Sequence, residues 1–175
     1  MDPRRNGMIE SVEDFYAHAC AMEREAAERY SEFADYFADH GEQRIAALCH
    51  ALAVLEDAHR QRLRARAGGE EPALPPGDRW LDTGAPETAA HEFVFRIANP
   101  RQMLEIALDG ERRAKNYFEH VAAESSDPAV RKLASALAGE ELQHVRWVEE
   151  ALARAADPEI DWERYFKGDP DDGLD

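Results

Sequence analysis

The sequence predicts an all-α protein: a single domain over residues 1–175, built as a four-helix bundle of two helical hairpins joined by a long crossover, with a short C-terminal helix. Three observations predict this architecture. Apolar residues recur at alternating steps of three and four in four long segments, the spacing of one buried helical stripe. Only short breaks separate the first segment from the second and the third from the fourth. A long stretch rich in proline and glycine separates the two pairs.

The first hairpin has recognisable helix boundaries. Ser11 followed by Asp14 resembles a capping box, and helical periodicity runs over residues 11–40 to a stop at Gly41. The second helix follows at once and is expected over residues 42–66, where a pair of glycines ends it. Such a short break predicts that the two helices lie antiparallel.

The second hairpin begins after the crossover, which is expected over residues 68–99. Asn99 provides a capping side chain, Pro100 suits the first helical turn, and Gln102 stands at the reciprocal capping position. The third helix is therefore expected over residues 100–125.

The fourth helix is expected over residues 128–156, with Asp127 and Pro128 repeating the same start. A short helix is expected over residues 160–166. Three aromatic residues would dock it on the bundle: Trp162, Tyr165 and Phe166.

Six polar side chains fall where the helical stripes should be apolar. Each hairpin carries a lone Glu on its first helix and a Glu-x-x-His step on its second. The six residues are Glu23, Glu56, His59, Glu111, Glu141 and His144. In the first hairpin, Glu23 lies 18 residues before Gly41 and Glu56 lies 15 after it, so both are about 25 Å from the turn. The second hairpin has nearly the same spacing, which predicts that all six side chains meet at one depth.

Four carboxylates in one apolar interior require compensating charge. An ionised carboxylate in a dry core is strongly unfavourable unless something positive shares the space. Four carboxylates and two neutral imidazoles carry a formal charge of about minus four, which two divalent cations cancel. Oxygen and nitrogen ligands suit iron or manganese. The pattern therefore predicts a two-metal site, and the alternative is a metal-free bundle whose carboxylates are protonated or solvated.

The composition is strongly acidic and narrows the range of partners. The chain has 21 Lys and Arg against 37 Asp and Glu, a formal net charge of −16. Such a surface repels phosphate backbones and anionic lipids, so neither nucleic acid nor a membrane is expected as a partner. No stretch has the apolar pattern of a signal peptide or a membrane span, which predicts a cytoplasmic location. Cys20 and Cys49 are expected to lie roughly 20 Å apart in height and to stay unbridged.

Three further residues lie on or near the stripes. Tyr30 lies one heptad from Glu23 and could donate a hydrogen bond to a ligand carboxylate, although an ordinary core tyrosine fits equally well. His18 lies off the stripes, so it is expected to be exposed or half-buried. Glu140 neighbours Glu141 in sequence but is expected to face elsewhere.

The whole set of spacings resembles the di-iron carboxylate proteins of the ferritin-like superfamily, most closely the rubrerythrin-type branch without a rubredoxin domain. The motifs are Glu23-x-x-Ala26-x-x-x-Tyr30, Glu56-x-x-His59, Glu111-x-x-Ala114-x-x-x-Phe118 and Glu141-x-x-His144. They span roughly residues 11–155. The resemblance implies two iron ions, with manganese or zinc as substitutes. It also implies ligand roles: Glu56 and Glu141 bridging both ions, Glu23 with His59 completing one, and Glu111 with His144 completing the other.

Two departures from the rubrerythrin pattern bear on activity. Rubrerythrins proper carry an additional Glu one turn after the ligand of the third helix, where this sequence has Ala114. They also carry a rubredoxin-like iron domain with paired Cys-x-x-Cys motifs, which this sequence lacks. Both differences weaken the case for the rubrerythrin route of peroxide reduction. The symmetric set that remains resembles bacterioferritin-type ferroxidase centres.

The resemblance and the ligand set together predict a di-iron oxidoreductase that reduces peroxide or dioxygen in oxidative-stress defence. An unidentified electron donor is expected to supply its electrons. One alternative is a ferroxidase coupled to iron storage. Another is a metal-free helical interaction or structural bundle. A homodimer is expected, because the long crossover could exchange hairpins between two chains.

Overall fold

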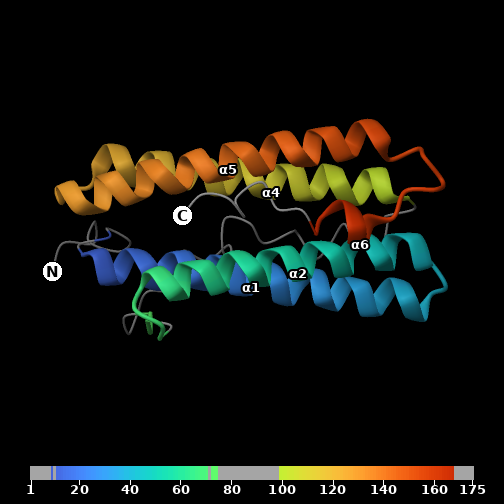
Figure 1. Cartoon of the computed structure of the whole chain (residues 1–175), viewed down its shortest axis with the longest axis horizontal. Coiled ribbons are helices and arrows are strands. Elements are labelled where there is room, and N and C mark those ends of the chain that lie inside the picture. The colour runs from blue at the N-terminus through green and yellow to red at the C-terminus, as the bar shows by residue number, and fades with distance from the viewer. Residues whose placement is uncertain (1–8, 10, 71, 75–98, 168–175) are drawn as a thin grey trace, which may run out of the picture.

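The structure is a computed structural model that describes residues 9, 11–70, 72–74 and 99–167. All regular secondary structure in these residues is helical, and the predicted fold class is confirmed. The helices are α1 (Val12–Asp39), α2 (Gln43–Arg66), α4 (Pro100–Glu124), α5 (Pro128–Arg154) and α6 (Trp162–Tyr165) (Figure 1). Most of the expected crossover lies outside the described residues.

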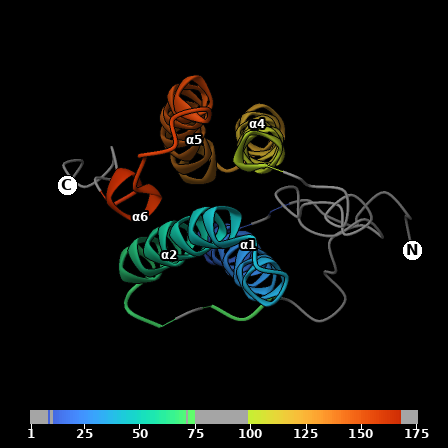
Figure 2. The ribbon, with the colours of Figure 1, turned by 90° about the vertical axis from the view of Figure 1, so that its right-hand side faces the viewer.

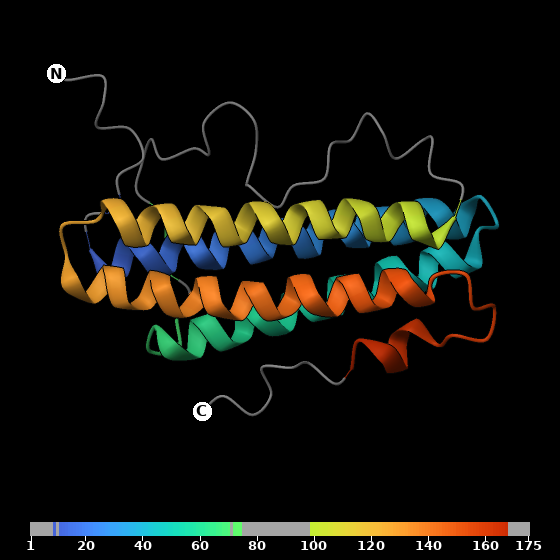
Figure 3. The same cartoon turned by 90° about the horizontal axis from the view of Figure 1, so that it is seen from above.

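The four long helices form two hairpins that face each other. Figures 1 and 3 show α1 and α2 side by side in one layer, with α4 and α5 in the other. Contacts join α2 to α4 and α1 to α5, so both hairpins share one interior. Viewed along the bundle, α6 lies beside α2 and α5 (Figure 2), and it contacts α2.

The long helices start at the capping residues expected from the sequence. The Ser11 side chain accepts a hydrogen bond of 3.0 Å from the backbone N–H of Asp14. Asn99 accepts one of 3.1 Å from the N–H of Gln102, and Asp127 caps α5 in a similar way. Each cap satisfies a backbone donor that the first helical turn leaves without an intrahelical partner.

Glycines in the left-handed conformation end both helices of the first hairpin. Gly41 has φ of 80°, and the N–H of Glu42 donates to the carbonyl oxygen of Phe37 at 2.9 Å. Gly68 and Gly69, with φ of 107° and 97°, follow the end of α2. Because L-residues avoid this region, these glycines stop the helices within a few residues.

The last helix is shorter than the range 160–166 expected from the sequence. The Asp161 side chain accepts a backbone hydrogen bond of 3.0 Å in the first turn, so α6 begins at Trp162. Trp162 and Phe166 are buried, and the Phe166 ring lies 5.1 Å from that of Trp147 on α5. The aromatic residues therefore dock this helix on the bundle, as expected.

The apolar core is divided into two clusters along the bundle. On every long helix the boundary between the clusters falls at the predicted metal ligands. The apolar residues on either side of that boundary are Met22 and Ala26 on α1, Leu63 and Leu55 on α2, Ala114 and Leu108 on α4, and Ala138 and Val145 on α5. A polar centre thus lies between two apolar layers.

Two sequence expectations about individual residues have different outcomes. Cys20 and Cys49 are both free thiols, as predicted, and they lie in different apolar clusters. The expectation for His18 is wrong, because only 8% of its surface is exposed. Its Nδ1 lies 2.7 Å from the carbonyl oxygen of Asp14, one turn earlier, and this contact gives the buried ring a polar partner.

The outer faces of the bundle are charged and carry ion pairs. Arg112 of α4 reaches Glu149 of α5 at 2.8 Å, and Lys115 pairs with Glu119 at 2.6 Å within α4. Among the helices in the described part of the chain, none combines the length and apolar character that crossing a membrane requires.

We expect Asn99→Ala to lower the free energy of unfolding by about 1 kcal/mol, because the N–H of Gln102 then loses its capping partner. Urea titration of the variant measures the loss. Asn99→Asp keeps the acceptor oxygen and should match the wild type. Equal stability of the Ala variant and the wild type would show that this cap contributes nothing.

Candidate metal centre

All six residues predicted to bind metal meet inside the bundle. They form two groups, each able to hold a metal ion, with ligand atoms within 4.8 Å of one another: Glu23, Glu56 and His59, and Glu111, Glu141 and His144. Each of the six has only 2–4% of its surface exposed. The first group comes from α1 and α2 and the second from α4 and α5, so each hairpin builds one half of the centre.

The two halves have nearly the same geometry. In each, the Nδ1 atom of the imidazole faces both carboxylates of its own group. The Nδ1–Oε2 distances are 3.6 Å for Glu23–His59, 3.2 Å for Glu56–His59, 3.6 Å for Glu111–His144 and 3.3 Å for Glu141–His144. Residues three apart on a helix share a face, so each Glu-x-x-His step turns both side chains toward the same point.

The two halves join into one centre through their histidines. The rings of His59 and His144 stack with centroids 4.1 Å apart and planes 9° from parallel. The negative charge of Glu56 also acts on Glu111 across the gap between hairpins, and that of Glu141 acts on Glu23. The centre is therefore a single cluster of four carboxylates and two imidazoles.

The pKa values of the buried carboxyl groups are shifted in opposite directions. It raises the pKa of Glu23 well above its usual value, and it raises the pKa of Glu111 to about 8, with the charge of Glu56 adding to the effect. Burial also pushes the pKa of Glu56 upward, but the hydrogen bond and charge of His59 outweigh it, so this pKa is lowered. Without added cations, Glu111 is thus held protonated near neutral pH, and the raised pKa of Glu23 favours its protonated form as well.

The donor set fits a pair of divalent metal ions. The Glu23 Oε2 atom is buried and has no hydrogen-bond partner, which is unfavourable for a carboxylate oxygen unless a cation lies beside it. Carboxylate oxygen with imidazole nitrogen is a donor combination that iron and manganese accept. The arrangement can therefore hold two ions, one in each half.

A small pocket of about 10 Å³ lies beside this centre, between α2 and α5. Its lining residues are Glu23, His59, Arg62, Leu63, Arg66, Leu137, Glu140, Glu141 and His144. Glu140 lines this pocket beside Glu141, and its carboxylate pairs with Arg66 at 2.9 Å. Arg62 and Arg66 were not expected to take part, although their positions three and seven residues after His59 place them on the same face of α2.

The positions of Tyr30 and Ala114 bear on the wider surroundings of the centre. Tyr30 is 4% exposed, and its ring lies 6.4 Å from that of Phe33 in an apolar cluster. Its hydrogen bond to a ligand carboxylate stays a prediction. Ala114 is completely buried among apolar side chains. The site where rubrerythrins proper have their additional Glu is therefore apolar in this protein.

The fold and the centre define the class of protein. A helical bundle of two hairpins with a carboxylate and histidine pair of metal sites in its interior is characteristic of ferritin-like di-iron proteins. A family model described as Rubrerythrin matches residues 14–152, and the chain belongs to this family.

A solved structure agrees with this assignment. The chain is similar to an uncharacterised conserved protein from Magnetospirillum magnetotacticum MS-1, with 32% sequence identity and a TM-score of 0.60. The similarity covers 86% of this chain and 99% of the other. Among curated proteins, none matches the chain significantly. The family and the two metal-binding groups together support a di-iron protein.

We expect the stability of the metal-free protein to fall as the pH rises from 5 to 8. Between the unfolded value of 4.5 and about 8, the native state keeps a proton on Glu111 that the unfolded state has lost. The raised pKa of Glu23 acts in the same direction. Each such proton contributes a slope of up to about 1.4 kcal/mol per pH unit. Glu56 does not oppose this fall, since its lowered pKa lies below the window.

Urea unfolding after chelation, repeated at several pH values, measures this dependence. The matched control is Glu111→Gln, which is close in shape but does not titrate, and its stability should vary less with pH. A wild-type protein whose stability is level or rises across this range would contradict the assignment of protonated carboxyls.

We expect added ferrous or manganese ions to stabilise the protein, by about 2.7 kcal/mol when the free ion exceeds its dissociation constant a hundredfold. Glu56→Ala should lower both the bound metal and this stabilisation. Asp57→Ala is the matched control, because Asp57 is half exposed and pairs with Arg60 at 2.8 Å. Elemental analysis and thermal unfolding provide the two readouts, and equal metal content in both variants would exclude Glu56 as a ligand.

Proposed function

We propose that this protein is a di-iron carboxylate oxidoreductase that reduces peroxide or dioxygen in oxidative-stress defence. One observation carries the proposal: two matching groups of buried carboxylates and imidazole face each other across stacked histidine rings. Membership of the Rubrerythrin family supports iron as the metal.

In this proposal Glu23 and His59 bind one ion, and Glu111 and His144 bind the other. Glu56 and Glu141 lie in the same two groups and would bridge the ions. The Nδ1–Oε2 distances of 3.2–3.6 Å support Nδ1 as the imidazole ligand atom. A pair of ferrous ions would supply two electrons to one oxidant molecule.

The residues of the chain prepare the centre for this chemistry in two ways. Burial of the six side chains between apolar layers excludes bulk water, which strengthens the attraction between carboxylates and cations. Burial raises the pKa of both Glu23 and Glu111, and bound cations would favour their charged forms, so the proton held on Glu111 is released when cations bind.

Ferroxidation coupled to iron storage is the second candidate. The apolar surroundings of Ala114 favour it, because they leave the symmetric set of six ligands without an additional carboxylate. Storage needs a large shell or an encapsulating partner. The proposed redox enzyme instead is a cytoplasmic homodimer served by a separate electron donor, so the mass in solution discriminates the two.

The test is to load the metal-free protein anaerobically with ferrous iron and then add peroxide. We expect two irons per chain, a rise in near-ultraviolet absorption as they are oxidised, and repeated turnover when a reductant is present. Glu56→Ala should lose turnover, whereas Asp57→Ala should keep it.

Two results would reject the proposal. Less than one metal per chain after iron loading would favour a metal-free structural bundle, in which Glu56→Ala is harmless. Oxidation of iron by dioxygen without peroxide turnover, in a particle of many subunits, would favour the storage role.

A further inference from the structure

We propose that Trp147 and Tyr165 pass electrons one at a time from the surface of the bundle to the metal centre, and that they supply the electrons of dioxygen reduction that two ferrous ions do not. This inference rests on the proposed function and gives a role to two residues outside the ligand set. Its basis is the position of Trp147 on α5, the ring contacts between α5 and α6, and the surroundings of the Tyr165 hydroxyl.

Dioxygen takes up more electrons than two ferrous ions release on becoming ferric. Its reduction to two water molecules needs four electrons and four protons, whereas each ferrous ion gives up one electron. Two further electrons have to come from another source, and the side chains close to the centre are the nearest one. Indole and phenol rings lose single electrons more readily than other side chains that lack sulfur. An aromatic residue beside the ligands can therefore complete the reduction.

Trp147 lies one helical turn after the candidate ligand His144. Residues three apart share a face of a helix, and side chains lean toward the N-terminal end of their own helix. The indole of Trp147 therefore leans toward the turn that carries His144. It packs against the apolar cluster that begins beside the ligands with Val145 and Leu55. An electron that leaves Trp147 thus has a path to the centre within one turn of α5.

Ring contacts connect Trp147 to α6. Its ring lies 6.1 Å from that of Tyr165, with planes 29° from parallel, and 5.1 Å from that of Phe166. The Tyr165 hydroxyl donates a hydrogen bond of 3.3 Å to the carbonyl oxygen of Trp147. Both Trp147 and Tyr165 are half-buried and pack against the same apolar cluster. The two rings therefore form one aromatic contact that extends from the interior to solvent.

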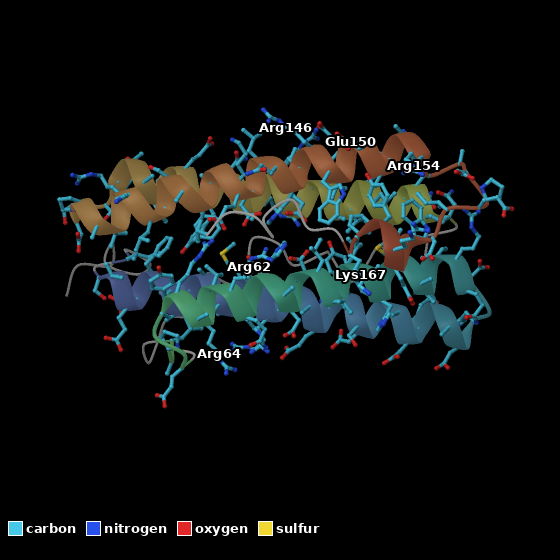
Figure 4. The ribbon with its side chains drawn as sticks, in the orientation of Figure 1. Arg62, Arg64, Arg146, Glu150, Arg154 and Lys167 are labelled. Carbon is cyan, nitrogen blue, oxygen red and sulfur yellow. The ribbon has the colours of Figure 1, made fainter. Side chains whose placement is uncertain are left out.

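The surroundings of Tyr165 suit the outer position in this relay. Burial and the charge of Glu150 raise the pKa of its hydroxyl, although the charge of Arg154 lowers it, so the group is protonated at rest. The Arg154 guanidinium lies 5.3 Å from the centre of the ring, and its positive charge disfavours a second one on the phenol. Glu150 and Arg154 lie on the part of α5 near α6 (Figure 4). An oxidised Tyr165 therefore loses its hydroxyl proton to solvent and becomes a neutral radical.

Trp162 contacts the same rings but does not suit the relay. It is 2% exposed, and its ring lies 6.1 Å from that of Tyr165. Its Nε1 atom is buried and has no hydrogen-bond partner in the described part of the chain. An oxidised indole at this position has no acceptor for its proton. Trp162 is therefore the matched control for Trp147.

The proposed transfer balances in electrons and protons. Trp147 gives one electron toward the centre and becomes an indole radical cation. Tyr165 returns one electron to Trp147 and releases its hydroxyl proton to solvent. A reductant that donates hydrogen atoms, such as ascorbate, then restores Tyr165. Two such rounds add two electrons to those of the two ferrous ions, and the four protons needed for two water molecules come from solvent.

The test uses the full chain, loaded anaerobically with ferrous iron, mixed with dioxygen and rapidly frozen. Electron paramagnetic resonance then identifies organic radicals. Without ascorbate, the wild type should show a tyrosine radical, and ascorbate should remove it. Tyr165→Phe should show an indole radical instead, and Trp147→Phe should lose both signals.

The control variant is Trp162→Phe, which makes the same change of ring within the same aromatic contacts. It should keep the tyrosine radical. Equal loss of the radical in Trp162→Phe and Trp147→Phe would assign these rings to the docking of α6 alone and would overturn the relay.

Peptide mapping of the wild type gives a second readout that needs no variant to fold. The iron-loaded protein is exposed repeatedly to dioxygen without ascorbate, and mass spectrometry locates the added oxygen. We expect modification at Trp147 and Tyr165 but not at Trp162. An unmodified Trp147, or equal modification of Trp147 and Trp162, would overturn the relay.

The outcomes separate this inference from the proposed function. Wild-type protein that binds no iron would reject both. Iron-loaded wild type that turns over peroxide, but forms no organic radical with dioxygen, would overturn the relay and leave the function standing. A tyrosine radical that persists in Trp147→Phe would also overturn it.

Discussion

The structure depends on one constraint, which is the placement of four carboxyl groups inside a helical bundle. Apolar layers lie on both sides of these groups, with Met22 and Ala26 next to Glu23 as an example. An ionised carboxylate in such surroundings needs a cation or a proton. All four carboxyl groups have to be compensated at one place in the bundle. For this reason the ligands lie at the same height in both hairpins, and each imidazole lies beside carboxylates.

The centre is nearly symmetric in its residues but not in its electrostatics or in the pocket beside it. Glu56 has a lowered pKa because His59 stabilises its charge, whereas Glu111, in the other half, is held protonated by burial. The pocket beside the centre is lined by both histidines together with Glu23 and Glu141.

The charges around this pocket are mixed, whereas the chain as a whole is strongly acidic. With a net charge of −16, the surface as a whole attracts cations. At the seam between α2 and α5, Arg62 and Arg66 line the pocket together with Glu23, Glu140 and Glu141, so basic and acidic side chains lie close together there.

The sequence by itself determined the helices and the depth of each ligand. Caps such as Ser11 and Asn99 fixed where helices begin, and the stripe through Glu23 fixed its face and height, because both depend only on local geometry along one helix. Tertiary structure decided the contacts between residues of different helices, because these contacts depend on how the two hairpins pack side by side. The stacking of His59 on His144, the contact of Arg66 with Glu140 and the burial of His18 all belong to this second group. The periodicity of apolar residues indicates which way a side chain faces on its own helix. The packing of the helices determines which neighbour that side chain contacts.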